Sequence, residues 1–152
     1  MISVARLAMV VGLAGLIPFL AGAIGLLLWP GESSWLISWF YLYSAGILAF
    51  MAGVYWPVAM QLENRCYPLS PIATLVTSQV LFLTAGLLLL LPVGWQAVLY
   101  PLAYLAMCLI DLRWLFDYWP TWYRRLRAGL TAVVIVCQLA VALWLFMNGT
   151  TL

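Results

Sequence analysis

The sequence predicts an all-α polytopic membrane protein, a bundle of five transmembrane helices with short loops. Three observations predict this class. Of the 152 residues, 68% are hydrophobic and 7% are charged, whereas soluble domains carry roughly 25% charged residues. The apolar residues form five long runs, and nearly all charged residues fall between the runs. Such a chain has too much apolar surface for water, so we expect it in a lipid bilayer.

Five segments are long enough to cross a bilayer. The hydrocarbon core is ~30 Å thick and a helix rises ~1.5 Å per residue, so a span needs about 20 mostly apolar residues. We treat the chain as a single domain over residues 1–152, whose spans are expected at 7–29, 35–60, 70–91, 95–115 and 128–147.

The first run resembles a secretory signal peptide, because Arg6 precedes it and Ala21-Gly22-Ala23 resembles a cleavage site. A signal peptide has an apolar region of about 7–15 residues. The run at 7–29 is longer than that, so we interpret it as a retained span.

Local signals support the later helices. Ser34 is a candidate N-cap for the second helix, and Ser70 followed by Pro71 places an N-cap and a first-turn proline at the third. Pro92 and Gly94 make such a short connection that the third and fourth helices are expected to be antiparallel neighbours.

Small residues recur at spacings that allow close helix contact. They are expected to form ridges where helices pack within the chain or between chains. The ridges are Ala21 with Gly25 on the first span, and Ala45, Ala49 and Gly53 on the second.

Arginines predict the orientation of the bundle. All six basic residues fall in the N-terminal tail, the second loop or the fourth loop, and cytoplasmic loops are the ones enriched in Lys and Arg. We therefore expect a cytoplasmic N-terminus and an external C-terminus in a bacterial inner membrane. The residues are Arg6, Arg65, Arg113, Arg124, Arg125 and Arg127.

The composition removes several classes of chemistry. Histidine and lysine are absent, which excludes a His-ligated haem, a Ser-His-Asp triad and a lysine Schiff base. Cys66, Cys108 and Cys137 are widely spaced and are interpreted as free thiols. We expect no catalytic residue, no cofactor and no metal, and a net charge of +2 gives no basis for nucleic-acid binding.

A stripe of polar side chains runs along the fourth span. Tyr100, Tyr104, Cys108 and Asp111 are spaced by four, four and three, which places them on one helix face. Asp111 is the carboxylate within a span, where ionisable groups are costly. We expect Asp111 to belong to a polar cluster or ligand contact at the cytoplasmic end of the bundle, together with residues of neighbouring segments. The candidate residues are Tyr55, Trp56, Tyr104, Asp111, Arg113, Arg124 and Arg127.

Two interpretations of Asp111 are open at this stage. In the first interpretation, Asp111 pairs with Arg113 or Arg127 and so fixes the fourth loop. We expect this loop, from Asp111 to Arg127, to lie along the membrane surface. Alternatively, Asp111 and Tyr104 border a cavity between the second, fourth and fifth spans that admits a lipid head group or a quinone.

Three stretches together resemble one known family. They are the sequences LAGLIPF at 13–19, YLYSAGILAFMAGVYWPVAM at 41–60, and WYRRLR at 122–127 followed by Thr131. The chain resembles the domain of unknown function 3429 family, which includes the transmembrane protein 69 family of eukaryotes. The resemblance implies the five-span fold and no established activity. Tyr55 and Pro57 stand where many members have histidine and glycine, so no imidazole role is expected here.

The sequence leaves two functions in competition. The first is a non-catalytic accessory or assembly subunit of a membrane complex, or a homo-oligomer, because nearly all available surface is helix face. The second is binding or transport of a lipid, quinone or other small hydrophobic molecule. An intramembrane enzyme ranks third, since Asp111 and Asp117 lack the glycine-rich context of membrane aspartyl proteases.

Overall fold

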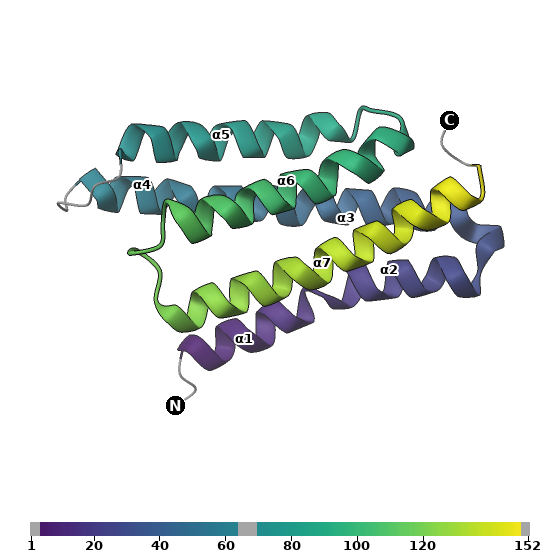
Figure 1. Cartoon of the computed structure of the whole chain (residues 1–152), viewed down its shortest axis with the longest axis horizontal. Coiled ribbons are helices and arrows are strands. Elements are labelled where there is room, and N and C mark those ends of the chain that lie inside the picture. The colour runs from purple at the N-terminus through teal and green to yellow at the C-terminus, as the bar shows by residue number, and fades with distance from the viewer. Residues whose placement is uncertain (1–3, 64–69, 150–152) are drawn as a thin grey trace.

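The computed structural model describes residues 4–63 and 70–149, so Arg65 and Cys66 lie outside the described residues. Every regular element in these ranges is helical (Figure 1). The elements are α1 (Val4–Ala14), α2 (Ile17–Leu28), the short 3₁₀ helix η1 (Pro30–Glu32), α3 (Ser33–Gly53), α4 (Tyr55–Glu63), α5 (Pro71–Leu88), α6 (Val93–Arg113) and α7 (Thr121–Met147).

Within the described residues, five helical stretches are long and apolar enough to cross a membrane. They cover Ala5–Leu28, Pro30–Glu63, Pro71–Leu88, Val93–Arg113 and Thr121–Met147. Large apolar side chains from these stretches are exposed around the bundle, including Leu27, Ile72 and Leu87. Exposed apolar surface on this scale requires an apolar surrounding. The predicted all-α five-helix class is confirmed.

Proline interrupts the first stretch. Pro18 has no N–H to donate to the carbonyl four residues earlier, and the chain makes a turn at Gly15 and Leu16 between α1 and α2. The Tyr43 hydroxyl of α3 donates to the Gly15 carbonyl over 2.9 Å. A side chain of a neighbouring helix therefore supplies a hydrogen bond where the first helix is broken.

A second interruption separates α3 from α4. Pro57 leaves the Gly53 carbonyl without its usual helical donor, and α3 ends at Gly53. The Ser78 hydroxyl of α5 donates to the adjacent Ala52 carbonyl over 2.7 Å. Pro101, by contrast, lies inside α6 without ending it.

Helix starts agree only in part with the sequence signals. Ser70 caps α5, accepting a hydrogen bond from the Ala73 N–H over 3.3 Å, with Pro71 in the first turn. The prediction for Ser34 is wrong, because α3 begins at Ser33 after the cap residue Glu32. Ser34 is already helical, and its carbonyl accepts from the Ser38 hydroxyl over 2.8 Å.

The last helix is longer than the sequence predicted. It begins at Thr121, directly after Pro120, rather than at Ala128. The arginines had placed this segment in a loop, but a helix tolerates Arg124 and Arg127 where they find partners or reach the interface. The connection from α6 is correspondingly short, and neither Asp111 nor Arg127 belongs to a loop.

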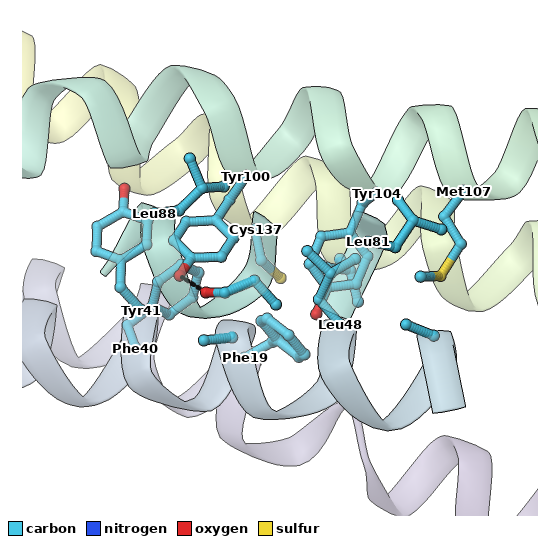
Figure 2. Close-up of a cluster of buried hydrophobic side chains, with 14 of the residues drawn as sticks. Phe19, Phe40, Tyr41, Leu48, Leu81, Leu88, Tyr100, Tyr104, Met107 and Cys137 are labelled. Carbon is cyan, nitrogen blue, oxygen red and sulfur yellow. Dashed lines mark hydrogen bonds between the residues drawn. The ribbon is translucent and has the colours of Figure 1, made fainter. Parts of the chain in front are cut away.

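Helix α3 lies at the centre of the bundle and contacts α2, α5 and α6, while α7 packs against α6, α2 and α1. The core of the bundle is rich in aromatic rings (Figure 2). Tyr41 of α3 stacks on Tyr100 of α6 with ring centroids 5.6 Å apart. Phe19 of α2 meets Phe40, Tyr43 and Tyr104 edge to face.

Close approach of α2 to α3 depends on Gly22. A Cβ added at Gly22 would lie 2.7 Å from Cδ2 of Phe40, whereas one at Gly25 would lie 3.5 Å from Leu36. Ala21, predicted to share a packing ridge with Gly25, is exposed. The prediction is wrong for Ala21, whose place in the packed face is taken by Gly22, whereas Gly25 is buried and faces α3 as expected.

The two ends of the bundle differ in charge. The start of α1, the end of α6 and the start of α7 lie at one end (Figure 1) and carry every arginine of the described residues. The opposite end, where α2 leads into α3, carries Glu32 and the exposed side chains of Trp29 and Trp35. Trp114 and Trp122 are exposed at the arginine-rich end.

Candidate functional site

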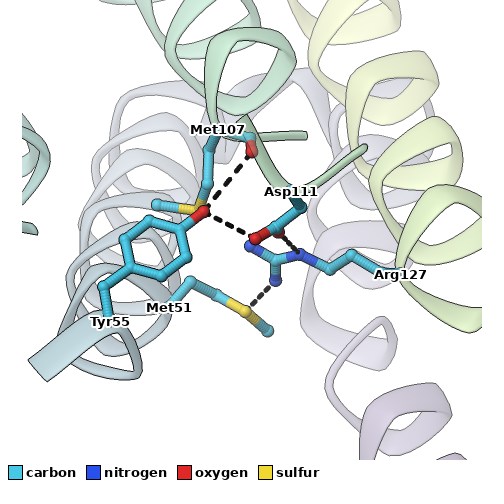
Figure 3. A network of polar contacts seen from close by, with 5 residues as sticks. All are labelled: Met51, Tyr55, Met107, Asp111 and Arg127. Atoms are coloured by element: carbon cyan, nitrogen blue, oxygen red, sulfur yellow. Dashed lines mark hydrogen bonds and ion pairs between the residues drawn. The ribbon is translucent and has the colours of Figure 1, made fainter. Parts of the chain in front are cut away.

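The strongest polar contacts of the described residues meet where α4, α6 and α7 come together. The break before α4 places Tyr55 at the first position of that helix, with its side chain 2% exposed. Met51, one helical turn earlier in α3, points toward the same region (Figure 3). The interruption by Pro57 thus sits beside the residues that α3 and α4 contribute to this site.

Helix α6 supplies the carboxylate. Tyr100, Tyr104, Cys108 and Asp111 are all buried, as their spacing predicted. Tyr100 and Tyr104 use their hydroxyls to tie α6 to its neighbours, donating to the Ala85 carbonyl of α5 over 3.0 Å and the Ser44 carbonyl of α3 over 2.8 Å. These bonds fix the rotation of α6 and hence the direction of Asp111.

Asp111 and Arg127 form a buried ion pair. Nε of Arg127 donates to Oδ2 of Asp111 over 2.7 Å, and the Tyr55 hydroxyl donates to Oδ1 over 2.7 Å (Figure 3). The exposed fractions of the two charged residues are 3% and 7%. Both carboxylate oxygens have a donor, which is the condition for keeping a charge buried.

The guanidinium of Arg127 also reaches Met51, whose Sδ accepts from Nη1. Arginine carries five N–H donors. The bonds to Asp111 and Met51 use the Nε hydrogen and one hydrogen of Nη1, and thioethers are weak acceptors. Arg127 therefore has more donors than these two bonds use.

A cavity of about 440 Å³ adjoins the ion pair. Its wall is made by α1, α2, α3, α6 and α7, and it is mostly apolar, with Arg127, Thr131, Tyr43 and Tyr104 as the polar side chains. Val11 and Phe50 line it and are also exposed on the outer surface. The cavity therefore opens between α1 and α3 toward the surroundings of the bundle.

This cavity is not placed as the sequence analysis expected. The second, fourth and fifth spans contribute to it, but α1 and α2 of the first span complete it through residues such as Gly12, Leu16 and Phe19. Tyr104 borders the cavity, whereas Asp111 lies behind Arg127 and is not part of the wall. The first span was missed because nothing in its apolar sequence marks a cavity.

The predicted cluster separates into two groups. Tyr55, Asp111 and Arg127 are in contact, and Tyr104 joins Arg127 in the cavity wall. Trp56 is 44% exposed. Arg113 is exposed, and Arg124 places its guanidinium 3.6 Å from the centroid of the Phe116 ring.

Sequence reasoning missed Met51 and Tyr43. Met51 precedes Tyr55 by four residues, a spacing that puts both on one face if the helix direction is kept through the break. That signal was available. Tyr43 had no comparable signal, because its bond to Gly15 depends on how α2 and α3 pack.

No group of three or more Cys, Asp or Glu residues within the described ranges could hold a metal ion. Of the nearby thiols, Cys108 and Cys137 are free and buried. The contacts at this site are hydrogen bonds and an ion pair inside an apolar bundle.

Fold and site together define a helical protein with five membrane-length stretches and a buried ion pair beside an apolar cavity. The family model described as "Protein of unknown function (DUF3429)" matches residues 4–143. The chain belongs to this family. Searches among curated proteins and among solved structures found no match.

Proposed function

We propose that this protein is a non-catalytic membrane protein that binds a small, largely apolar molecule in the cavity between α1, α2, α3 and α7. One observation carries the proposal: an apolar cavity of about 440 Å³ has a buried guanidinium in its wall, with more N–H donors than its bonds to Asp111 and Met51 use. Sites for small molecules are typically concave, mostly apolar and supplied with a few polar groups that orient the ligand.

The surroundings of the cavity support a ligand that arrives from the membrane. Val11 and Phe50 lie both in the wall and on the outer surface. A lipid-soluble molecule reaching this opening keeps its apolar part in contact with hydrocarbon throughout entry. Its polar end gains hydrogen bonds only at the inner wall, beside Arg127.

A variant that fills the cavity tests this function. Ile47 lines the cavity and is only partly buried, so Ile47→Trp adds volume where space exists. Leu139→Trp on the exposed face of α7 is the matched control. Lipid-soluble molecules that co-purify in mild detergent are extracted and quantified by mass spectrometry.

We expect the original protein and Leu139→Trp to retain one enriched molecule that Ile47→Trp loses. Equal recovery from all three proteins, with their melting temperatures unchanged, would contradict binding in this cavity.

Self-association is the second candidate, and a separate groove along α3 favours it. The groove has a volume of about 440 Å³ between α3 and α5, and Gly46 and Gly86 contribute to its wall. A Cβ at either glycine would meet no atom within 4 Å, which leaves room for a helix of a second copy. Native mass in mild detergent tests this, with Gly46→Leu expected to turn a dimer into a monomer.

We also propose an orientation. The arginine-rich end, at the start of α1 and α7, faces the cytoplasm of a bacterium whose inner membrane holds the protein. The C-terminus then lies outside. A reporter that is active only in the cytoplasm, fused after Leu152, should be silent, and the same reporter fused before Met1 should be active. Activity at Leu152 would reject the orientation.

A further inference from the structure

The polar side chains of the cavity wall do not have equal hydrogen-bonding capacity left for a ligand. Tyr43 and Tyr104 each use their single hydroxyl hydrogen on a backbone carbonyl, of Gly15 and Ser44 respectively. Their oxygens can still accept, but they cannot donate. The donors that remain for a bound molecule are the N–H groups of Arg127 and the hydroxyl of Thr131, so the molecule must present an acceptor.

The charge of Arg127 is already compensated. Asp111 accepts from Nε at 2.7 Å in a region where both groups are buried. An anionic ligand would bring a second negative charge next to this carboxylate and would lose its hydration without meeting a free cation. An uncharged acceptor avoids both costs and still satisfies the N–H groups of the guanidinium.

The rest of the wall fixes the other end of the molecule. Leu16, Phe19 and Val134 continue the cavity with apolar surface, and the opening at Val11 and Phe50 leads to the outer face of the bundle. A volume of about 440 Å³ is in the range of pockets for small organic ligands. A ring or ester group with part of a chain fits inside, and a longer tail extends through the opening.

We propose that the cavity takes an uncharged, lipid-soluble carbonyl compound whose carbonyl oxygen accepts from the Arg127 guanidinium and whose apolar tail leaves between α1 and α3. Two sources share this chemistry, a quinone with a hydrocarbon tail and a diacylglycerol. The inference rests on the proposed binding function and adds the chemical class of the ligand.

Four probes test the class with the full-length protein in detergent: a short-chain benzoquinone, dioleoylglycerol, oleate and hexadecane. Affinities are measured by displacement of a radiolabelled probe. We expect the quinone or the diacylglycerol to bind at least about tenfold more tightly than oleate and than hexadecane, because hydrogen bonds to a charged group contribute the equivalent of about tenfold or more. The better of the first two probes identifies the source.

Two variants test the roles of the paired charges. Asp111→Asn removes the compensating charge while retaining an acceptor for Arg127, so oleate affinity should rise by about tenfold and affinity for the uncharged carbonyl probe should change by less than about threefold. Arg127→Lys keeps the cation beside Asp111 but loses the planar fork of donors. It should weaken the carbonyl probe by about tenfold, whereas Arg125→Lys on the exposed face of α7 should leave it unchanged.

The outcomes separate the ligand class from the function. Tighter binding of oleate than of either carbonyl probe to the original protein would overturn the uncharged class. Equal binding of hexadecane and the carbonyl probes would show that the acceptor is irrelevant. Either result leaves binding in the cavity standing, whereas failure of all four probes to bind folded protein would reject both proposals.

Discussion

Arg127 of α7 and Asp111 of α6 are joined by a 2.7 Å ion pair inside the bundle, with less than a tenth of either residue exposed. Tyr55 of α4 completes the contact by donating to the second carboxylate oxygen. Three segments that are distant in the sequence thus depend on one another at this point. The pair also positions Arg127 in the cavity wall, so its structural role and the binding role that we propose meet in one side chain.

Removing one partner of this pair should lower the free energy of unfolding more than removing both partners does. Asp111→Leu leaves a buried guanidinium without compensation and is expected to lower the free energy of unfolding by about 3–5 kcal/mol, while Asp111→Leu with Arg127→Met is expected to recover most of that loss. Reversible denaturation in mixed detergent measures both. A double variant as unstable as the single one would contradict this account of the pair.

Loss of the hydroxyl should change the stability of the protein differently at two neighbouring tyrosines. The Tyr43 hydroxyl donates to the Gly15 carbonyl at the break in the first span, whereas the Tyr41 hydroxyl is buried without a partner in the described part of the chain. Tyr43→Phe should cost about 0.6–1.7 kcal/mol. Tyr41→Phe should be neutral or stabilising, since it removes an unsatisfied group.

Thermal unfolding of the two variants in the same detergent makes this comparison directly. If Tyr41→Phe proves the more damaging substitution, then its hydroxyl has a partner, such as a bound water, and the prediction is wrong.

Gln138 should be replaceable by leucine with a gain in stability. It is 0% exposed, and neither its side-chain nitrogen nor its side-chain oxygen has a hydrogen-bond partner among the described residues. An unpaired buried polar group costs about 1–3 kcal/mol, so Gln138→Leu is expected to raise the free energy of unfolding by up to that amount. Leu139→Val on the exposed face is the control, and a lower melting temperature for Gln138→Leu would refute the prediction.

Two glycines on α2 provide a test of helix packing. A Cβ at Gly22 would meet the Phe40 ring at 2.7 Å, and Phe40 is only 3% exposed, so it has little freedom to move. Gly22→Ala is expected to destabilise by about 1–3 kcal/mol through overpacking. Gly25→Ala makes an ordinary contact with Leu36 and should stabilise by a few tenths to about 1 kcal/mol through helix propensity.

Circular dichroism during heating compares these two alanine variants. Equal melting temperatures would show that α2 and α3 can separate at no cost, contrary to the close approach at Gly22.

Residue spacing accounts for what the sequence predicted about the site. The stripe from Tyr100 to Asp111 follows from helical periodicity alone, and the expense of a buried carboxylate implied an arginine partner. Which arginine it is could not be predicted, because Arg127 reaches Asp111 through the packing of α7 against α6. The start of α7 at Thr121 could not be predicted either, since it depends on the tertiary contacts of Arg124 and Arg127.

The cavity was harder to predict than the ion pair, for a physical reason. Its wall includes Gly12 and Leu16, which have no polar feature that separates them from other residues of an apolar span. A cavity arises from imperfect packing between helices, and the interruption at Gly15 and Leu16 contributes to where α1 lies. Pro18 removes one helical hydrogen bond, but its position in the sequence does not say how α1 and α2 pack around the break.

The position of Arg127 has a consequence for how the chain is made. Asp111 belongs to the fourth span and its cation to the fifth, so the carboxylate is compensated only once α7 has packed against α6. A chain that stops before Thr121 therefore has a carboxylate in the bundle with a Tyr55 donor but without the Arg127 cation. The last helix completes the charge balance of the helices before it, which makes its docking the step that distinguishes a finished protein from an incomplete one.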